Sequence, residues 1–377
     1  MKKIGILTIT DYLNYGNRLQ NYATQEILKA RGFDVVSIAN VTISPKEEGF
    51  KFLMFRIKNA LGKSPATLLR SFQEKLRERQ NKEKYVAGQR NKEKSFREFS
   101  AKHIAETGYV ISPENLPKNL SEEFDYFVVG SDQIWNPNIR YGSSVDFLTF
   151  APVEKRIAFA PSFGVSHIPE KFTDDYRCWL NKMKCISVRE DAGADIVKEL
   201  TGKDVPVLID PTLMLSEEKW LQVSEKARKK PEKPYIVTYF IGTMSGARKK
   251  LIHKLASDNN LDLAMLANLD DIDRYDANPG EFIDYIHFAE LVCTDSFHAI
   301  IFAIQMKRPF IVFDREGKSV PMSSRIDTLL RKFHFEDRKY SEKKISRDYF
   351  EINFEHVDNI LKGEIEKVNN YLDAAFN

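Results

Sequence analysis

The turn 291-LVCTDSFHAIIF-302 places a histidine between two apolar segments, where it could handle a proton beside a bound anion. His298 can act as a general acid or base, because histidine is the side chain that most readily changes its charge near neutral pH. Ser296 is a good N-cap for the following helix, and the free backbone N–H groups at a helix start bind anions. Asp295 could support the histidine. A lone histidine at a helix start is more often structural, so position alone does not decide its role.

Two arginines stand where an anion could be held. Arg189 directly follows the apolar segment 185–188, and a planar guanidinium suits a carboxylate or a phosphate. Its structural alternative is an ion pair with Glu190, Asp191 or Asp195. Arg18 lies in the first turn of an expected helix, where the positive end of the helix dipole disfavours a cation. A bound anion would relieve that conflict.

Further polar clusters follow other apolar segments. The stretch 10-TDYLNYGNRLQN-21 contains Asn14 and Asn17, which could bind a ligand or cap the helix. The stretch 130-GSDQIWNP-137 combines a flat aromatic ring with hydrogen-bonding groups, as a sugar-recognising surface does. The residues of this stretch expected to contact a sugar are Ser131, Asp132, Gln133, Trp135 and Asn136. A buried, structural Trp135 is an equally good interpretation.

Strands that alternate with helices would position these clusters. In the first half of the chain, apolar segments predict strands at 4–10, 35–39, 126–129, 157–160, 185–188 and 207–209, and helices are expected near 16–31, 170–183 and 191–200. In the second half, the predicted strands are 235–241, 261–267, 290–293 and 309–313, and helices are expected near 245–258, 280–288 and 297–306. Such alternation is typical of parallel sheets covered by helices. Ligands bind beyond the carboxyl ends of those strands, so the polar clusters are expected to share one site.

With 377 residues the chain is too long for one ordinary core, and two domains are expected. We place an N-terminal Rossmann-like domain at 1–225, with a basic helical insertion near 45–120. A second Rossmann-like domain is placed at 226–345, and the linker KARKKPEKP at 226–234 precedes its first strand. Residues 346–377 are expected to form helices that pack back on the first domain. The predicted fold class is α/β, with two doubly wound domains facing across a cleft.

Composition indicates a soluble globular protein, with 42% hydrophobic and 29% charged residues and a net charge of +3. The charge is uneven, because residues 51–102 contain 15 basic and 5 acidic residues. The segment 51-KFLMFRIKNALGK-63 could lie on an anionic membrane surface, or it could be part of a charged arm packed over the domain. We expect no nucleic-acid partner, since no binding motif accompanies the charge. Single cysteines and the lack of a span of ~20 apolar residues favour a cytoplasmic protein, associated at most with the inner face of the membrane.

Five motifs in a fixed order resemble the bacterial polysaccharide pyruvyl transferase family. They are NYGNRLQNYA, GSDQIWNP, SVRED, LIDPTLML and CTDSFHA, within matching blocks from about residue 3 to 315. The resemblance implies a GT-B-like fold and phosphoenolpyruvate as the donor, with no metal and no further cofactor. It implies that two hydroxyls of a sugar or a lipid-linked oligosaccharide receive the pyruvyl group as a ketal, in capsule or exopolysaccharide synthesis.

The resemblance also implies roles for single residues. His298 corresponds to a histidine that relatives carry after a strand of the second domain, and it would transfer a proton. Arg189 corresponds to an arginine that would grip the anionic groups of the donor. We expect Ser296, Phe297 and Arg18 to contact the donor as well.

The chain departs from its relatives in one motif. Well-studied members carry Arg-Leu-His where this chain has Ser-Phe-His at 296–298, so one cation that would contact the donor is missing. Arg18, Arg308 or Arg325 could supply that charge. Two alternative functions therefore stay open: a GT-B-type glycosyltransferase that uses a nucleotide sugar, and a non-catalytic sugar-binding or scaffolding relative.

Overall fold

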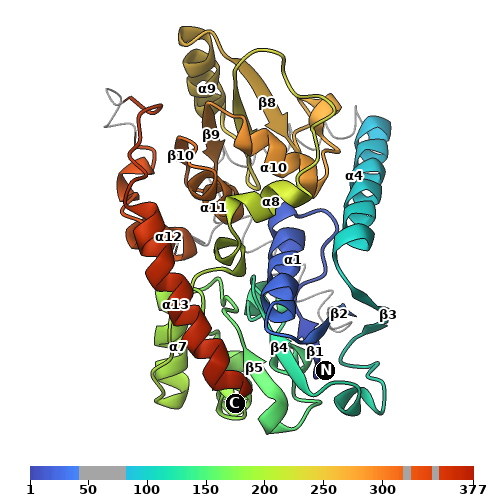
Figure 1. Ribbon diagram of the computed structural model, residues 1–377. Helices are drawn as coiled ribbons and strands as arrows, with labels where there is room; N and C mark the ends of the chain where they lie inside the picture. Colours follow the sequence, from blue (N-terminus) through green and yellow to red (C-terminus); the bar gives the residue numbers. More distant parts are fainter. Residues whose placement is uncertain (42–81, 317–323, 342–347) are drawn as a thin grey trace.

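A computed structural model of the chain describes residues 1–41, 82–316, 324–341 and 348–377. The basic segment 51–63 lies outside the described residues, so a membrane contact through it stays a prediction. Figure 1 shows two α/β units, one above the other, with a long helix near the C-terminus that runs down beside the lower unit. Within the described ranges, no helix is both long and apolar enough to span a bilayer.

The first unit is built around a six-stranded parallel sheet. Its strands are β1 (Lys3–Leu7), β2 (Asp34–Asn40), β3 (Glu106–Ile111), β4 (Tyr126–Val129), β5 (Arg156–Ala158) and β6 (Cys185–Ile186). Their order is β3-β2-β1-β4-β5-β6, the order of a doubly wound sheet whose direction of winding reverses between β1 and β4. The helices of this unit are α1 (Tyr15–Lys29), α4 (Lys82–His103), α5 (Pro137–Arg140), α6 (Thr173–Asn181), α7 (Asp191–Thr201) and α8 (Glu217–Val223).

The second unit is built around a four-stranded parallel sheet. Its strands are β7 (Tyr235–Tyr239), β8 (Asp262–Leu266), β9 (Leu291–Thr294) and β10 (Phe310–Val312), in the order β10-β9-β7-β8. The winding of this sheet reverses between β7 and β9. Its helices are α9 (Gly246–Asp258), α10 (Pro279–His287), α11 (Phe297–Gln305) and α12 (Ser324–Lys332), and α13 (Val357–Phe376) ends the chain. Short 3-10 helices include η6 (Pro211–Met214), η7 (Ile272–Arg274) and η8 (Glu336–Arg338).

The two parallel sheets confirm the predicted fold class of two Rossmann-like units, and most predicted elements are found within a few residues of their expected bounds. Three details differ. The segment 207–209 makes only an isolated bridge from Val207 to Val188. The C-terminal segment contains a single helix, α13, which begins only at Val357. The strand β3 was not predicted, because it lies at the edge of the sheet and half of its side chains stay partly exposed.

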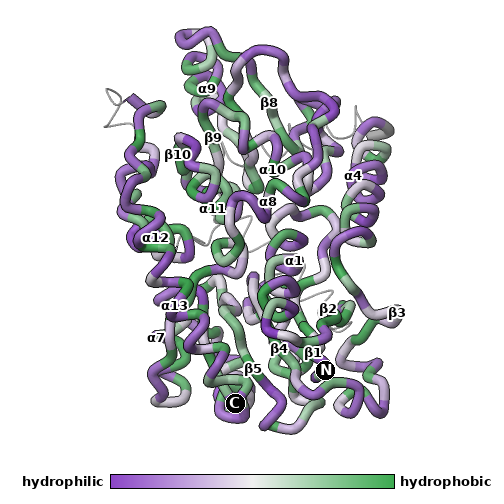
Figure 2. The backbone as a smooth tube through the Cα atoms, in the orientation of Figure 1, coloured by the Kyte–Doolittle hydropathy of each residue, from purple (hydrophilic) through white to green (hydrophobic). Residues whose placement is uncertain are grey.

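The interior of the protein is continuous across the two units. Tyr15 of α1 stacks on Phe282 of α10 with ring centroids 4.4 Å apart, and its hydroxyl donates to the Ala277 carbonyl at 2.9 Å. Helix α13 returns to the first sheet, where the Tyr371 hydroxyl donates to the Ala158 carbonyl at 2.6 Å. Hydrophobic and hydrophilic residues alternate along α13 in Figure 2, as expected for a helix with one buried face. Contacts between α1 and α10 therefore join the two units, and α13 joins the end of the chain to the first sheet.

Candidate functional site

The carboxyl ends of the two sheets meet where the units touch. Helix α1 follows β1 and helix α11 follows β9, each beside the point where its sheet reverses its winding. The imidazole of His298 lies directly on the backbone of α1, because a Cβ added to Gly16 would stand 1.9 Å from its Nδ1 atom. A histidine of the second unit therefore reaches the ligand-binding edge of the first sheet.

Asp210 joins the two residues that the sequence singled out. Arg189, which follows β6, donates to its Oδ2 atom at 2.5 Å, and the Nε2 atom of His298 lies 3.6 Å from the same oxygen. The other oxygen, Oδ1, accepts from the backbone N–H and the hydroxyl of Thr212 at 3.0 and 2.6 Å. All of these side chains are buried. Arg189 and His298 therefore face one shared region, as a single site requires.

A second arginine approaches the same region from α12. The guanidinium of Arg325 lies 5.6 Å from the ring centroid of Phe297, and that of Arg189 lies 4.6 Å from it. Asp132 is within ion-pair distance of both arginines, at 3.5 Å from Arg189 and 4.0 Å from Arg325. Two buried cations thus share one aromatic ring and one carboxylate. We call Asp132, Arg189, Asp210, Phe297, His298 and Arg325 the Asp210 cluster.

Several polar atoms of this region are buried without a partner. Within the described residues, no hydrogen bond is made by Arg189 Nε, His298 Nε2, Arg325 Nε or the Oε2 atom of the adjacent Glu190. A buried polar group without a hydrogen bond costs about 1–3 kcal/mol, so folded proteins rarely leave several of them together. The Asp210 cluster is therefore built to receive a polar ligand or ordered water.

The charges of the cluster shift one another's protonation. Burial by itself raises the pKa of Asp210, but the imidazole of His298 and the guanidinium of Arg189 bring the pKa well below its usual value. The same balance, with Arg189 as the main opposing charge, lowers the pKa of Asp132. Burial and the charge of Arg189 lower the pKa of Arg325 to about 10, against the opposing charges of Asp132 and Glu190. Arg325 is thus a buried cation whose charge its surroundings compensate only in part, and an anion beside it would be stabilised.

For Arg189, contact with a donor anion stays a prediction. Arg189 is ion-paired, but its partners are Asp210 and Asp132 rather than the acidic residues that follow it in the chain. Ser296 caps α11 as predicted, since its side chain accepts from the backbone N–H of Ala299. Arg308 lies near Tyr235, at the opposite end of β7, and this position excludes it as the missing cation.

Arg18 is paired with a carboxylate of the protein. Its side chain is fully buried, and its Nη1 atom donates to Glu106 at 2.7 Å while Nη2 donates to the Ile9 carbonyl. The anion that offsets the dipole of α1 is therefore a carboxylate of the protein. The sequence pattern did not indicate this partner because Glu106 belongs to β3, a strand that was not predicted. Contact of Arg18 with a donor stays a prediction.

The predicted sugar surface requires a correction. Trp135 is fully buried, stacks on Phe147 with centroids 5.0 Å apart and donates from Nε1 to the Asp146 carbonyl at 2.8 Å. It cannot offer its face to a sugar, so the structural alternative is the right one. Asn136 is buried as the N-cap of α5, and its amide donates to Gln133 at 2.8 Å. Of Gln133, Trp135 and Asn136, only Gln133 is partly exposed, and its contact with a sugar stays a prediction.

The remaining predicted residues organise the loops around the cluster. Asn14 caps α1 by accepting from the backbone N–H of Asn17. The amide of Asn17 donates to Asp132 at 3.3 Å, and the Ser131 hydroxyl donates to Asp210 at 3.1 Å. These contacts hold the two carboxylates in place. For Asn14, Asn17 and Ser131, direct contact with an acceptor therefore stays a prediction.

Asp295 does not support His298 in the way that was predicted. Its two oxygens accept from the backbone N–H groups of Ile241 and Gly242 at 2.7 and 2.9 Å, which fixes the loop after β7. The carboxylate beside His298 is Asp210, from the other unit. Asp210 directly follows the predicted strand 207–209, within LIDPTLML, but no local pattern indicates which distant side chains it meets.

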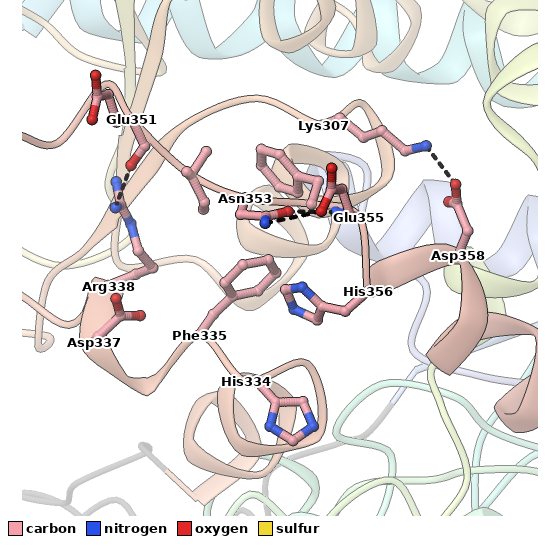
Figure 3. A pocket seen from close by; sticks show the side chains of 12 residues that line it. Lys307, His334, Phe335, Asp337, Arg338, Glu351, Asn353, Glu355, His356 and Asp358 are labelled. Atoms are coloured by element: carbon pink, nitrogen blue, oxygen red, sulfur yellow. Dashed lines mark hydrogen bonds and ion pairs between the residues drawn. The ribbon is translucent and has the colours of Figure 1, made fainter.

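A separate pocket lies on the second unit. It has a volume of about 970 Å³, and its lining includes Lys307, His334, Phe335, Arg338, Asn353 and His356. Figure 3 shows how its polar groups are used, with Lys307 paired with Asp358 and Arg338 donating to the Glu351 carbonyl. Within the described residues, no polar side-chain atom of its lining is buried and unpaired. Among these two regions, buried polar atoms without a partner occur in the Asp210 cluster and not in the lining of this pocket, for the residues that the structure describes.

Comparisons with known proteins give a family. Residues 14–317 match the family model described as polysaccharide pyruvyl transferase. No curated protein matches the chain significantly. Solved structures with a similar arrangement include UDP-GlcNAc 2-epimerase from Methanocaldococcus jannaschii, at 11% identity and a TM-score of 0.45 over 96% of this chain and 99% of that one. A glycosyltransferase from Rickettsia africae has 12% identity and a TM-score of 0.43 over 98% and 94% of the two chains. Similarities this low carry no information about the ligand.

Proposed function

We propose that this chain, which belongs to the polysaccharide pyruvyl transferase family, moves the pyruvyl group of phosphoenolpyruvate onto two hydroxyls of a sugar to form a pyruvate ketal. The observation that carries the proposal is the meeting of Arg189 and His298 at Asp210, across the two units. Proton transfer and anion binding are thereby available at one place. Capsule or exopolysaccharide synthesis is the setting that the family suggests.

The donor would be held by two arginines. Phosphoenolpyruvate carries a carboxylate and a phosphate, which arginine binds through charge-assisted hydrogen bonds. The guanidinium groups of Arg189 and Arg325 both contact the aromatic ring of Phe297, and the Nε atom of each makes no hydrogen bond to a described residue. The backbone N–H groups at the start of α11 lie beside them, at the positive end of the helix. In this proposal Arg325 supplies the cation that the turn at 296–298 lacks.

The reaction requires proton transfers on both substrates, the donor and the sugar. The methylene carbon of the donor gains one proton, and two sugar hydroxyls bond to the central carbon and lose theirs. The bond from that carbon to the phosphate oxygen breaks, so the products are the ketal and inorganic phosphate. His298 transfers one of these protons as a general acid or base, a role that contributes typically ~10²–10⁴-fold to a rate. Asp210 orients the ring and is its counter-ion when the ring carries the proton.

The test compares donors and one variant. We expect phosphoenolpyruvate to raise the melting temperature of the wild type by mass action. When an acceptor sugar is added, the wild type should release inorganic phosphate from phosphoenolpyruvate. His298→Gln should bind the donor but lose phosphate release by ~10²-fold or more. His334→Gln, in the separate pocket, is the matched control and should keep full activity.

The alternatives give different results in the same experiment. Stabilisation by a nucleotide sugar in place of phosphoenolpyruvate would indicate a glycosyltransferase. Binding of phosphoenolpyruvate without release of its phosphate, whichever acceptor is added, would indicate a non-catalytic relative. Unchanged turnover in His298→Gln would remove this residue from the mechanism.

A further inference from the structure

The burial of Trp135 leaves open which groups hold the acceptor, and three polar side chains around Tyr15 remain free to do so. Lys92 projects from α4 and is only 6% exposed. Its Nζ atom lies 4.9 Å from the ring centroid of Tyr15, 5.4 Å from that of Phe96 and 5.8 Å from that of Tyr275. No described residue accepts a hydrogen bond from this ammonium group, whose three N–H donors are thus available to a ligand.

Asp11 and Tyr239 complete this group from two other elements. Asp11 lies in the loop between β1 and α1, and its Oδ1 atom accepts from the backbone N–H of Leu13 at 2.8 Å. Its other oxygen has no hydrogen-bond partner in the described part of the chain. Tyr239 ends β7, and its ring meets the edge of Tyr15 with centroids 5.1 Å apart. Its hydroxyl makes no hydrogen bond to any described residue.

Lys92 and Tyr239 both contact the ring of Tyr15, and the loop that contains Asp11 leads directly into the helix of Tyr15. Burial lowers the pKa of Lys92 to about 8, and the carboxylate of Asp11 is the charge that opposes this shift. Burial raises the pKa of Tyr239, and the charge of Asp295, followed by those of Asp11 and Asp132, contributes to the rise. Asp132 belongs to the Asp210 cluster, and Tyr15 immediately precedes Gly16, on which His298 packs. The free groups therefore lie next to the proposed reaction site.

We propose that Lys92, Asp11 and Tyr239 form the subsite that holds the acceptor sugar beside His298. The Lys92 ammonium donates to one sugar hydroxyl, the Asp11 carboxylate accepts from another, and the Tyr239 hydroxyl serves as donor or acceptor for a third. That this sugar is the acceptor of the reaction rests on the proposed function, whereas the binding of a sugar by these three residues does not.

The mixture of groups favours a neutral sugar over an anion. A sugar hydroxyl both donates and accepts, so adjacent hydroxyls match an ammonium and a carboxylate that stand close together. A phosphate or carboxylate ligand would be attracted by Lys92 but repelled by Asp11. A structural role is the competing explanation for Lys92, because three aromatic rings already surround its charge. A variant that removes the charge but keeps the side-chain stem separates these explanations.

The experiment uses the full chain and saturation-transfer NMR with methyl glucoside, methyl galactoside and methyl mannoside as probes. We expect at least one of them to bind the wild type. Lys92→Met should weaken that binding about tenfold or more, because it removes a charged hydrogen bond. Tyr239→Phe keeps the ring and should weaken binding by roughly threefold to tenfold. Lys94→Met is the matched control, since the side chain of Lys94 on the same helix is 77% exposed and should not affect binding.

Donor binding is measured in parallel, so that the two proposals fail separately. Lys92→Met should keep the thermal shift produced by phosphoenolpyruvate, and Arg189→Met should lose that shift while still binding the sugar. Failure of phosphoenolpyruvate to bind would remove the proposed function but not the subsite. The subsite would be overturned by equal sugar binding in the wild type and Lys92→Met, or by no binding of any methyl glycoside. Loss of sugar and donor binding together in Lys92→Met would assign the residue a structural role, and competition by inorganic phosphate would assign the site to an anion.

Discussion

The Asp210 cluster and the pocket of Figure 3 both combine histidine, acidic side chains and arginine, but their arginines are bonded differently. Arg338, beside the pocket, donates to the carbonyls of Phe310 and Glu351 at 3.0 and 3.1 Å. Arg189 and Arg325, in the cluster, each keep a buried Nε atom without a partner. A hollow of about 970 Å³ is thus less informative than a few buried groups that the fold leaves unpaired. Each prediction below perturbs one region and compares it with the other or with a neutral position.

The largest effect is expected for Asp210→Asn. Arg189 would lose its closest counter-charge while staying buried, so the free energy of unfolding should fall by about 3–5 kcal/mol, with loss of activity. Because the pKa of Asp210 is lowered from 3.8, its contribution in the wild type is present above pH 3.8 and is lost as the pH falls further. Denaturant unfolding between neutral and acidic pH measures both effects.

The control for this change is Asp358→Asn beside the pocket. Asp358 forms an exposed pair with Lys307, which should be worth at most ~1 kcal/mol. Equal destabilisation by the two variants would mean that the cluster is no more dependent on its charges than the surface.

Gly16→Ala should affect turnover next most strongly. The new methyl group would stand 1.9 Å from Nδ1 of His298, so the imidazole has to leave its present position beside Asp210. A displacement of about 1 Å in a reacting group can reduce a rate ~10²-fold. Initial rates of phosphate release test this, and Gly246→Ala is the control because a Cβ there would meet nothing within 4 Å. Equal rates in the two variants would contradict a catalytic position for His298.

Arg325→Met should act mainly on the donor. Its loss removes one charge-assisted contact, so the KM for phosphoenolpyruvate should rise by about tenfold. The pKa of Arg325 is lowered to about 10, which means that the fold disfavours its charge, and the ligand-free variant should therefore be as stable as the wild type or more stable. Arg308→Met, at the far end of β7, should leave the KM unchanged. A donor KM that stays constant in Arg325→Met would exclude it as the second cation.

The smallest effect is expected in the pocket itself. Asn353→Ala changes a lining residue whose side chain bonds mainly within its own loop, to Glu355 and its backbone N–H. Stability should change by no more than about 0.5 kcal/mol, and turnover should stay that of the wild type. A marked fall in turnover would instead link the pocket to the reaction.

Much of the fold could be predicted, because strands and helix caps are written in local patterns. The strand Tyr126–Val129 has the predicted bounds, and the helix after Ser296 begins where its cap indicates. The edge strand β3 was missed because partly exposed strands lack a continuous apolar signal. Because this strand was missed, the anionic partner of Arg18 was missed as well, since Glu106 lies on it.

The candidate site could be predicted only in its residue types and their strand-end positions. The sequence around Trp135 is equally compatible with a sugar-binding role and a structural role. Only the burial of Trp135 against Phe147 distinguishes the two roles. Likewise, Asp295 is the carboxylate nearest to His298 in the sequence, but Asp210 is its carboxylate partner in space. Such partners come from chain segments far apart, whose separation no local pattern encodes.

By itself, the sequence determined the alternation of strands and helices and the presence of histidine and arginine at strand ends, because these depend on neighbours within a few residues. The tertiary structure alone decided which charges are paired and which are left unmet. Electrostatic interactions depend on the distance between side chains and on their removal from water, and both are fixed only when the two units pack together. For this protein, that packing brings Arg189, Arg325 and His298 to one place.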